Sequence, residues 1–248
     1  MKHLQYRREV KGSPCAFLFV HGFLGTPDHF KPLLSLLPES VSVYNLRLAG
    51  HGKDPKAFAH TSMACWERQV EEAVKELLKG HDRVYIVAHS MGTLFAIDES
   101  RKQKCVAGLF LLAVPVKLRL KPKILIRSMK VCFDRATPDD PWELAAKRCY
   151  GLAPDPNPLH YLGWLPRVAE LFWKIYCTKK YLPHLKTPCA VLLSGLDELV
   201  SPASCASFQG NPRVHTVILP SSGHYYYPPE DLEGLLSAFR EFVREAGV

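Results

Sequence analysis

Residues 84–95 read Val84-Tyr85-Ile86-Val87-Ala88-His89-Ser90-Met91-Gly92-Thr93-Leu94-Phe95. The first five form a short apolar run, which predicts a buried strand. From Met91 onwards the apolar residues recur at helical spacing. Ser90 stands between the two elements, so the stretch predicts a strand that turns sharply into a helix at a serine. That geometry is a nucleophile elbow, which holds the hydroxyl exposed above the end of a sheet.

Two interpretations of Ser90 are open from this stretch alone. Small residues flank it, Ala88 two before and Gly92 two after, as a tight turn requires. The N-terminus of the following helix would favour negative charge developing there, and the Met91 N–H would point toward an oxyanion. Alternatively, Ser90 is only the N-cap of the helix, because serine is a favoured capping residue.

The composition is that of an ordinary globular chain. With 248 residues, 47% hydrophobic and 23% charged, the sequence is long enough for one large domain of helices and strands. No apolar run approaches the roughly 18 residues of a membrane span. Residues 1–9 lack the apolar segment of a secretory signal. We therefore expect no transmembrane segment and no signal peptide.

The cysteines indicate a cytoplasmic protein. There are eight of them, and no two form a CxxC pair. Several lie in apolar runs, where cysteine behaves as a small hydrophobic residue. We interpret them as reduced thiols and expect neither a disulfide scaffold nor a zinc site. They stand at positions 15, 65, 105, 132, 149, 177, 189 and 205.

Strand-like and helix-like segments alternate on both sides of the serine turn. Amphipathic spacing predicts helices at 30–37, 63–79 and 230–245, and apolar runs predict strands at 15–20, 41–46, 107–113, 188–194 and 214–219. The weaker alternation over 4–10 is typical of an antiparallel edge strand. This order predicts an α/β fold whose central sheet is mostly parallel, with helices on both faces.

Segment 114–187 breaks the alternation. It holds nine of the twenty prolines, no strong strand signal, and short amphipathic pieces at 124–133, 142–149 and 165–176. We predict that it forms a helical cap, or lid, inserted between two parts of one core, 1–113 and 188–248.

The same segment carries all of the excess positive charge. Its basic side chains number 14 and its acidic ones 6, whereas the rest of the chain has 18 of each, so the net charge of +8 belongs to the segment. The excess either attracts anionic substrates and makes weak contact with an anionic lipid surface, or is a solvated face. No nucleic-acid binding is expected, because the sequence contains no known module and no aromatic-basic stripe.

Large apolar residues of the segment allow two interpretations as well. They either line a pocket for an apolar substrate or form the small core of the cap; they are Phe133, Trp142, Leu162, Trp164, Phe172, Trp173 and Tyr176. From the whole chain we predict a substrate pocket made of Leu24, Trp142, Trp164, Val200 and Tyr225.

Three polar residues follow three predicted core strands, in the order Ser90, Asp197, His224. The carboxyl-terminal edge of an open α/β sheet is where ligands bind. Loop 21–27 follows another strand and contains two glycines, so its backbone could supply a second oxyanion donor, which we assign to the Phe23 N–H. His51, between two glycines, is more typical of a histidine that orders a loop than of a catalytic base.

These motifs resemble those of the α/β-hydrolase superfamily, and within it the serine carboxylesterases and monoacylglycerol-lipase-like enzymes. The resemblance rests on residues 21–25, 50–52, 88–92, 195–202 and 223–224, and it covers nearly the whole chain. Three positions depart from the family pattern. Ala88 stands where glycine is usual, Gly195 precedes Asp197 by two residues rather than three, and Glu198 offers a second carboxylate beside Asp197.

The resemblance implies a serine hydrolase that cleaves carboxylic esters of short to medium acyl chains. Ser90 would be the nucleophile, His224 the base and Asp197 its partner, with the N–H groups of Phe23 and Met91 binding the oxyanion. The resemblance implies a small-molecule ester as substrate and requires neither a metal nor an organic cofactor. It makes no prediction of the oligomeric state.

Other activities use the same arrangement. A monoacylglycerol or lysophospholipid lipase, a thioesterase and an acyltransferase all fit the triad, and a ligand-binding protein without activity can share the fold. Dehalogenases and epoxide hydrolases are less expected, because their nucleophile is an aspartate and this elbow carries Ser90.

Overall fold

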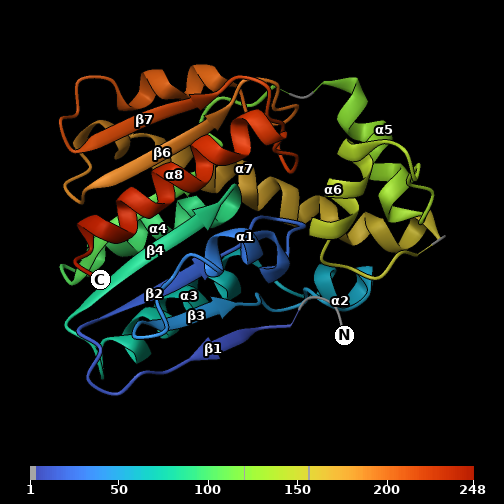
Figure 1. The fold of residues 1–248 in the computed structure, drawn as a ribbon. Coiled ribbons are helices and arrows are strands. Elements are labelled where there is room, and N and C mark those ends of the chain that lie inside the picture. Colours follow the sequence, from blue (N-terminus) through green and yellow to red (C-terminus); the bar gives the residue numbers. More distant parts are fainter. Residues whose placement is uncertain (1–3, 120, 156) are drawn as a thin grey trace.

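The computed structural model describes residues 4–119, 121–155 and 157–248. Seven strands form one sheet in the order β1-β3-β2-β4-β5-β6-β7 (Figure 1). Their bounds are β1 Tyr6–Arg8, β2 Cys15–Val20, β3 Ser42–Leu46, β4 Arg83–His89, β5 Val106–Leu112, β6 Cys189–Ser194 and β7 Val214–Leu219. Strand β1 pairs antiparallel with β3, and the other pairs of neighbouring strands are parallel, which confirms the predicted sheet.

Helices connect these strands. The α-helices are α1 Lys31–Leu34, α2 Pro55–Ala59, α3 Met63–Leu77, α4 Met91–Lys102, α5 Pro122–Cys132, α6 Pro141–Cys149, α7 Leu165–Lys179 and α8 Pro229–Glu245. The 3₁₀-helices are η1 Pro27–Phe30, η2 Pro158–Trp164, η3 Leu182–His184 and η4 Pro202–Phe208. Two predictions fall partly outside the described residues. The absence of a signal peptide concerns residues 1–9, of which 1–3 are not described, and segment 114–187 includes residues 120 and 156, which are not described either.

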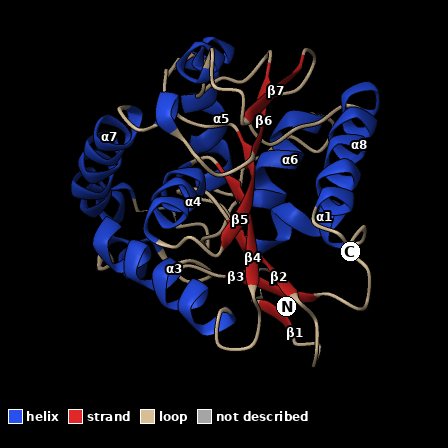
Figure 2. Ribbon diagram, turned by 90° about the vertical axis from the view of Figure 1, so that its left-hand side faces the viewer, coloured by secondary structure: helices blue, strands red, loops and turns tan. Residues whose placement is uncertain are grey.

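Strand β2 shows how the core divides into two layers. Its side chains alternate between the two faces of the sheet, as the pleat dictates. Leu18 belongs to the cluster that includes Trp66 of α3, whereas Phe17 belongs to the cluster that includes Phe242 of α8. Figure 2 shows the same division, with α3, α4 and α7 on one side of the sheet and α1 and α8 on the other. Helices cover both faces, as predicted.

Helix α3 illustrates why these residues form this element. Ser62 caps it, because the Ser62 hydroxyl accepts a hydrogen bond from the Cys65 N–H at 3.1 Å. Its buried positions recur every three or four residues and place Trp66, Val70 and Val74 against the sheet. Burial of side chains of this size contributes about 2 kcal/mol each. The helix ends at Leu77, two residues earlier than expected.

Two short regions differ from the sequence-based expectation. The single helix expected over 30–37 is a 3₁₀ turn, η1, followed by the one-turn helix α1. Helix α2 was not expected, since its five residues are too few to show a helical period. It begins where the Asp54 carboxylate accepts a hydrogen bond from the Ala57 N–H.

Segment 114–187 contains α5, α6, η2, α7 and η3 between β5 and β6. Helices α5 and α6 pack on each other beyond the carboxyl-terminal ends of the strands (Figure 1), whereas α7 packs against α3 and α4. No helix in the described ranges is both long and apolar enough to cross a membrane. The division into a core and a separate cap stays a prediction.

Candidate active site

Ser90 occupies the turn between β4 and α4 in a strained backbone conformation. Its φ is +52° and its ψ −123°, in a region that non-glycine residues rarely adopt. The Ser90 N–H donates to the Leu112 carbonyl at 2.9 Å, and the Ser90 carbonyl accepts from the Thr93 N–H at 2.9 Å. The hydroxyl makes no capping hydrogen bond, so the simple N-cap interpretation is wrong.

Glycines let the backbone close around this turn. A Cβ added to Gly92 would lie 2.3 Å from the Val20 carbonyl oxygen, so only glycine lets α4 approach β2 this closely. A Cβ added to Gly22 would lie 2.9 Å from Ser90 Cβ. Ala88 fits because it is still part of β4, paired with Val20 inside the sheet.

Asp197 and His224 form a buried pair at the ends of β6 and β7. Asp197 Oδ2 accepts a hydrogen bond from His224 Nδ1 at 2.9 Å, and the two residues are 1% and 2% exposed. Asp197 Oδ1 accepts from the N–H groups of Leu199 and Val200 at 2.7 and 2.8 Å. With its Nδ1 proton facing a carboxylate, the neutral His224 ring has Nε2 as its acceptor.

Glu198 has a different environment from Asp197. One of its carboxylate oxygens pairs with Arg127 of α5, and the other accepts from the His224 backbone N–H at 3.4 Å. Arg119 donates to the Asp197 carbonyl at 2.8 Å from the same side. Of the two carboxylates, Asp197 therefore contacts the His224 ring, while Glu198 binds the backbone that carries it.

The two histidines His89 and His29 join this site and were not predicted from the sequence. The His89 ring lies between the rings of His29 and His224, with centroids 4.1 and 4.7 Å away. His89 Nε2 donates to the His224 carbonyl at 3.0 Å, which links the elbow to the loop after β7. Burial lowers the pKa of His29 to about 3 and that of His89 well below its usual range, so both are neutral near pH 7.

Ser90 is placed near His224 by this packing, since His89 precedes Ser90 directly. Within the described residues, Ser90 Oγ and His224 Nε2 are not joined by a hydrogen bond. Hydrogen bonds between catalytic groups are often long before substrate binds. Among the described residues, the structure therefore contains the hydrogen bond between Asp197 and His224, but none between the Ser90 hydroxyl and the His224 ring.

Phe23 lies in loop 21–27, which follows β2. Its carbonyl accepts a hydrogen bond from His51 Nε2 at 2.6 Å, and its ring packs edge-on against Phe58 and Trp66. Burial lowers the pKa of His51 to about 4, so His51 acts as a neutral donor. This contact agrees with the expectation that His51 orders a loop. Among the described residues, the Phe23 N–H has no backbone acceptor.

The predicted pocket residues lie in different places. Leu24 and Tyr225 line a cavity of about 30 Å³ together with residues of α5, α6 and the chain after α6, namely Ser128, Val131, Ala146 and Tyr150. Trp142 packs on Gly223, where an added Cβ would lie 2.1 Å from the indole. The Trp164 indole N–H donates to the Pro55 carbonyl at 3.1 Å. Val200 is buried, and its N–H binds Asp197.

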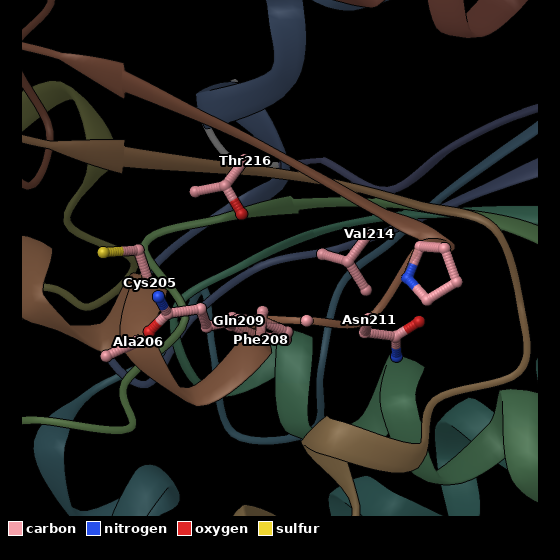
Figure 3. A pocket seen from close by; sticks show the side chains of 9 residues that line it. Cys205, Ala206, Phe208, Gln209, Asn211, Val214 and Thr216 are labelled. Atoms are coloured by element: carbon pink, nitrogen blue, oxygen red, sulfur yellow. The ribbon is translucent and has the colours of Figure 1, made fainter.

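Larger hollows are also present. One of about 430 Å³ shares Val131 and Tyr150 with the small cavity. Another of about 600 Å³ is formed by η4, the loop 209–212 and the first half of β7 (Figure 3). Val214 lines it at the start of β7, whereas His224 follows the end of that strand. Within the described ranges, no group of His, Cys, Asp or Glu side chains is arranged to hold a metal ion.

Several solved structures share the fold. A structure from work on the metagenome-derived lipolytic enzymes LipS and LipT has a TM-score of 0.73, with 21% identity over 98% of both chains. The monoacylglycerol lipase of Paleococcus ferrophilus gives 0.64 at 19% identity, covering 97% of this chain and 98% of that one. A haloalkane dehalogenase variant from Bradyrhizobium elkanii gives 0.63 at 17% identity, covering 98% and 96%. At these identities the likeness concerns the fold alone.

Sequence comparison adds a local match and a family. A thermostable monoacylglycerol lipase from Bacillus sp. (strain H-257) is 31% identical over 101 residues, which span 40% of this chain and 40% of the relative. The model of the alpha/beta hydrolase family matches residues 17–238, which include Ser90, Asp197 and His224. The match covers most of the chain, and the protein belongs to the alpha/beta hydrolase family.

Proposed function

We propose that the protein is a serine hydrolase that cleaves carboxylic esters of short to medium acyl chains. One observation carries the proposal: the strained Ser90 follows His89, whose ring hydrogen-bonds to the carbonyl of His224 beside the buried Asp197–His224 pair. Family membership and the lipolytic enzymes among its structural neighbours support the same reaction class. The dehalogenase alternative is not favoured, because Ser90 stands at the elbow.

In the proposed reaction, His224 Nε2 takes the proton of the Ser90 hydroxyl as Oγ attacks the ester carbonyl. Asp197 keeps the other ring nitrogen protonated and stabilises the imidazolium that forms. Collapse of the tetrahedral intermediate breaks the ester bond, and the alcohol leaves with the proton from His224. Water, activated by the same histidine, then hydrolyses the acyl-serine and regenerates the enzyme.

The oxyanion would be held by two backbone donors. Met91 is the first residue of α4, where N–H groups have no acceptor within the helix and the helix dipole favours negative charge. The Phe23 N–H would be the second donor. It shares a peptide group with the Gly22 carbonyl, which accepts a hydrogen bond from the Gly25 N–H at 3.1 Å and so helps to fix that group. Each such donor contributes roughly 3 kcal/mol to the stability of the transition state.

The cavity beside Leu24 and Tyr225, about 30 Å³, has room for only about one or two water molecules, so even a short acyl chain would require α5 and α6 to move. In this proposal segment 114–187 is the cap, because its residues Ser128, Val131 and Ala146 line the cavity together with Leu24 and Tyr225 of the core. The local match to a monoacylglycerol lipase favours a second candidate, a monoacylglycerol or lysophospholipid lipase. A longer chain would require a larger displacement of α5 and α6. A thioesterase would use the same groups.

Labelling with a fluorophosphonate probe tests the nucleophile. The probe reacts with an activated serine, so we expect a single adduct on the peptide that contains Ser90. Ser90→Ala should abolish the adduct, whereas Ser222→Ala, at a buried serine bound to Asp231, is the matched control that should still label. Absence of labelling in the folded wild type would favour a ligand-binding protein without activity.

A further inference from the structure

The outer face of α7 exposes a continuous row of apolar side chains. Six lie between 47% and 71% exposed: Leu159 and Leu162 of η2, and Leu165, Phe172, Trp173 and Tyr176 of α7. We call these six residues the α7 stripe. They make up half of the twelve large hydrophobic side chains that the described residues expose. Scattered exposed hydrophobic residues are ordinary, but a contiguous patch marks an interaction site.

Helical spacing puts the members of α7 on one side. Positions 165, 172, 173 and 176 fall within one face, and Ala169, also exposed, fills the gap between them. The helix has 15 residues, so this face runs for about 22 Å. Trp173 and Tyr176 stack on each other with centroids 5.7 Å apart. The sequence left open whether Phe172, Trp173 and Tyr176 line a pocket. Their exposed fractions are 47%, 67% and 71%, and Trp173 also borders a hollow of about 570 Å³ between α3 and α7.

The inner face of α7 explains why the stripe faces outward. Lys174 is buried there and pairs with both Glu67 of α3 and Asp98 of α4. The Glu170 carboxylate accepts from the Met63 N–H at 2.8 Å and pairs with Arg167. These charges fix the rotation of α7 on the molecule. In Figure 2, α7 forms the outer edge of the helical layer, with α3 and α4 between it and the sheet.

The charges at this surface are basic or already paired. Lys179 and Lys180 end the stripe and are exposed. Glu170 is the sole acid of α7, and its carboxylate is bound by Arg167 and Met63. Segment 114–187 as a whole has eight more basic than acidic residues. A second copy of the chain would bring the same lysines and no free carboxylate on its own stripe, so charge complementarity favours an anionic partner.

We infer that the α7 stripe is a docking surface for an anionic lipid interface. A helix lies in the plane of a membrane surface when one face carries Trp, Phe and Leu and lysines stand beside it. Tyrosine and tryptophan favour the headgroup level, and lysines are attracted to anionic headgroups. The stripe is a convex helix face, which suits a soft lipid surface. The inference does not depend on the proposed function, because it concerns binding and not turnover.

Vesicle binding of the full chain tests the inference. We expect the wild type to float with phosphatidylcholine vesicles that contain phosphatidylglycerol, to bind pure phosphatidylcholine less, and to bind less as salt screens the charges. The triple change Phe172→Ser, Trp173→Ser, Tyr176→Ser should lower the partition coefficient at least about tenfold, because it removes most of the inserted apolar area. The matched control is Leu196→Ser with Ile218→Ser, two exposed residues outside the stripe.

A charge test separates the lysines from the apolar row. Lys179→Glu with Lys180→Glu should weaken binding to anionic vesicles several-fold, whereas Lys79→Glu with Lys104→Glu, the same change in net charge elsewhere, should have less effect. Thermal unfolding shows that each variant folds. The inference is overturned if the wild type does not bind anionic vesicles at low salt, or if stripe and control variants bind equally. Loss of a dimer in the triple variant, without lipid binding, would assign the stripe to a second copy.

Discussion

Ser90 shows how a single residue can be held in an unfavourable backbone conformation. Its positive φ costs of order 1–3 kcal/mol, and the hydrogen bonds to Leu112 and Thr93 on either side of the turn offset that cost. The sequence was sufficient to predict this turn, because strand-like and helix-like patterns meet at the serine. Ser90 is the single residue between the end of β4 and the start of α4, and it therefore adopts the conformation of the sharp turn.

Gly92 is the position of the turn with the least space for a side chain. We predict that Gly92→Ala lowers the free energy of unfolding by roughly 2 kcal/mol, because the new methyl group would collide with the Val20 carbonyl and push α4 away from β2. Gly80→Ala is the control, since no heavy atom lies within 4 Å of its added Cβ. In urea unfolding, the free energy of unfolding of Gly80→Ala should lie within about 0.5 kcal/mol of that of wild type. Equal stability of the two variants would contradict the close α4–β2 contact.

His51 makes stability depend on pH. Its pKa is about 4 in the folded protein and about 6.5 when the chain unfolds. Between these pH values His51 therefore binds a proton in the unfolded chain but not in the folded protein. The free energy of unfolding should therefore fall as the pH drops from 6.5 toward 4. The contribution of His51 is about 1.4 kcal/mol per pH unit and is absent above that range.

Denaturant unfolding at pH 7.5 and pH 5 checks this prediction. His51→Gln should be less stable than wild type at pH 7.5, because the bond to the Phe23 carbonyl is weakened. It should, however, lose less stability between the two pH values. His60→Gln changes an exposed histidine and serves as the control. If His51→Gln and wild type lose the same stability on acidification, His51 is not the buried neutral group that the structure shows.

His89 marks the limit of prediction at the residue scale. It is next to Ser90 in the sequence, but its partner His224 is 135 residues away. No local pattern distinguishes a histidine that binds a distant carbonyl from one that packs in the core. The Asp197–His224 contact was predictable because family motifs mark both residues, whereas nothing in the sequence marks the stack of His29 on His89.

At the scale of elements, α5 is attached to the loop that carries Asp197. Arg127 of α5 pairs with Glu198, and its guanidinium also lies over the Trp142 ring at 5.3 Å. Because Glu198 accepts from the His224 N–H, the position of α5 is coupled to the backbone of the histidine. Removing one partner of a buried ion pair lowers stability strongly, because the other charge then stays buried without a counter-charge.

We predict that Arg127→Met lowers the free energy of unfolding by about 3 kcal/mol and lowers ester turnover as the His224 loop loosens. Adding Glu198→Gln should restore part of the stability, because the lone buried carboxylate is then removed. The control pair is Arg240–Glu233, which is exposed, and its double replacement should change stability by less than about 1 kcal/mol. Additive effects of Arg127→Met and Glu198→Gln in a double-mutant cycle would contradict the coupling.

The predictability of elements follows from their length and burial. Strand β2 was predicted with its observed bounds, because six consecutive apolar residues are typical of a strand buried on both faces. Helix α3 was predicted to within two residues at its end. Helix α2 and the η1–α1 region were not, because short turns follow from capping residues and tertiary contacts rather than from a period.

For the whole molecule, the order of elements predicted the sheet but not the placement of segment 114–187. Alternation of strands and helices implies parallel pairing with right-handed crossovers, and this is the fold observed. The apolar residues of α7 show a helical period without showing which face points inward. Lys174 determines which face points inward, because it pairs with Glu67 and Asp98. These two residues are 107 and 76 positions away in the sequence.

The proposal that the whole arrangement cleaves esters is tested most directly by the hydrolysis of p-nitrophenyl esters from acetate to palmitate, with Ser90→Ala alongside the wild type. We predict turnover that is highest for short and medium acyl chains, because a long chain would require the largest displacement of α5 and α6 around the cavity beside Leu24 and Tyr225. For the variant we predict a loss of at least about 10³-fold in kcat. A preference for long chains would favour the lipase alternative. Wild type that is folded and as inert as Ser90→Ala across the series would contradict the assignment of Ser90, Asp197 and His224 as a catalytic triad.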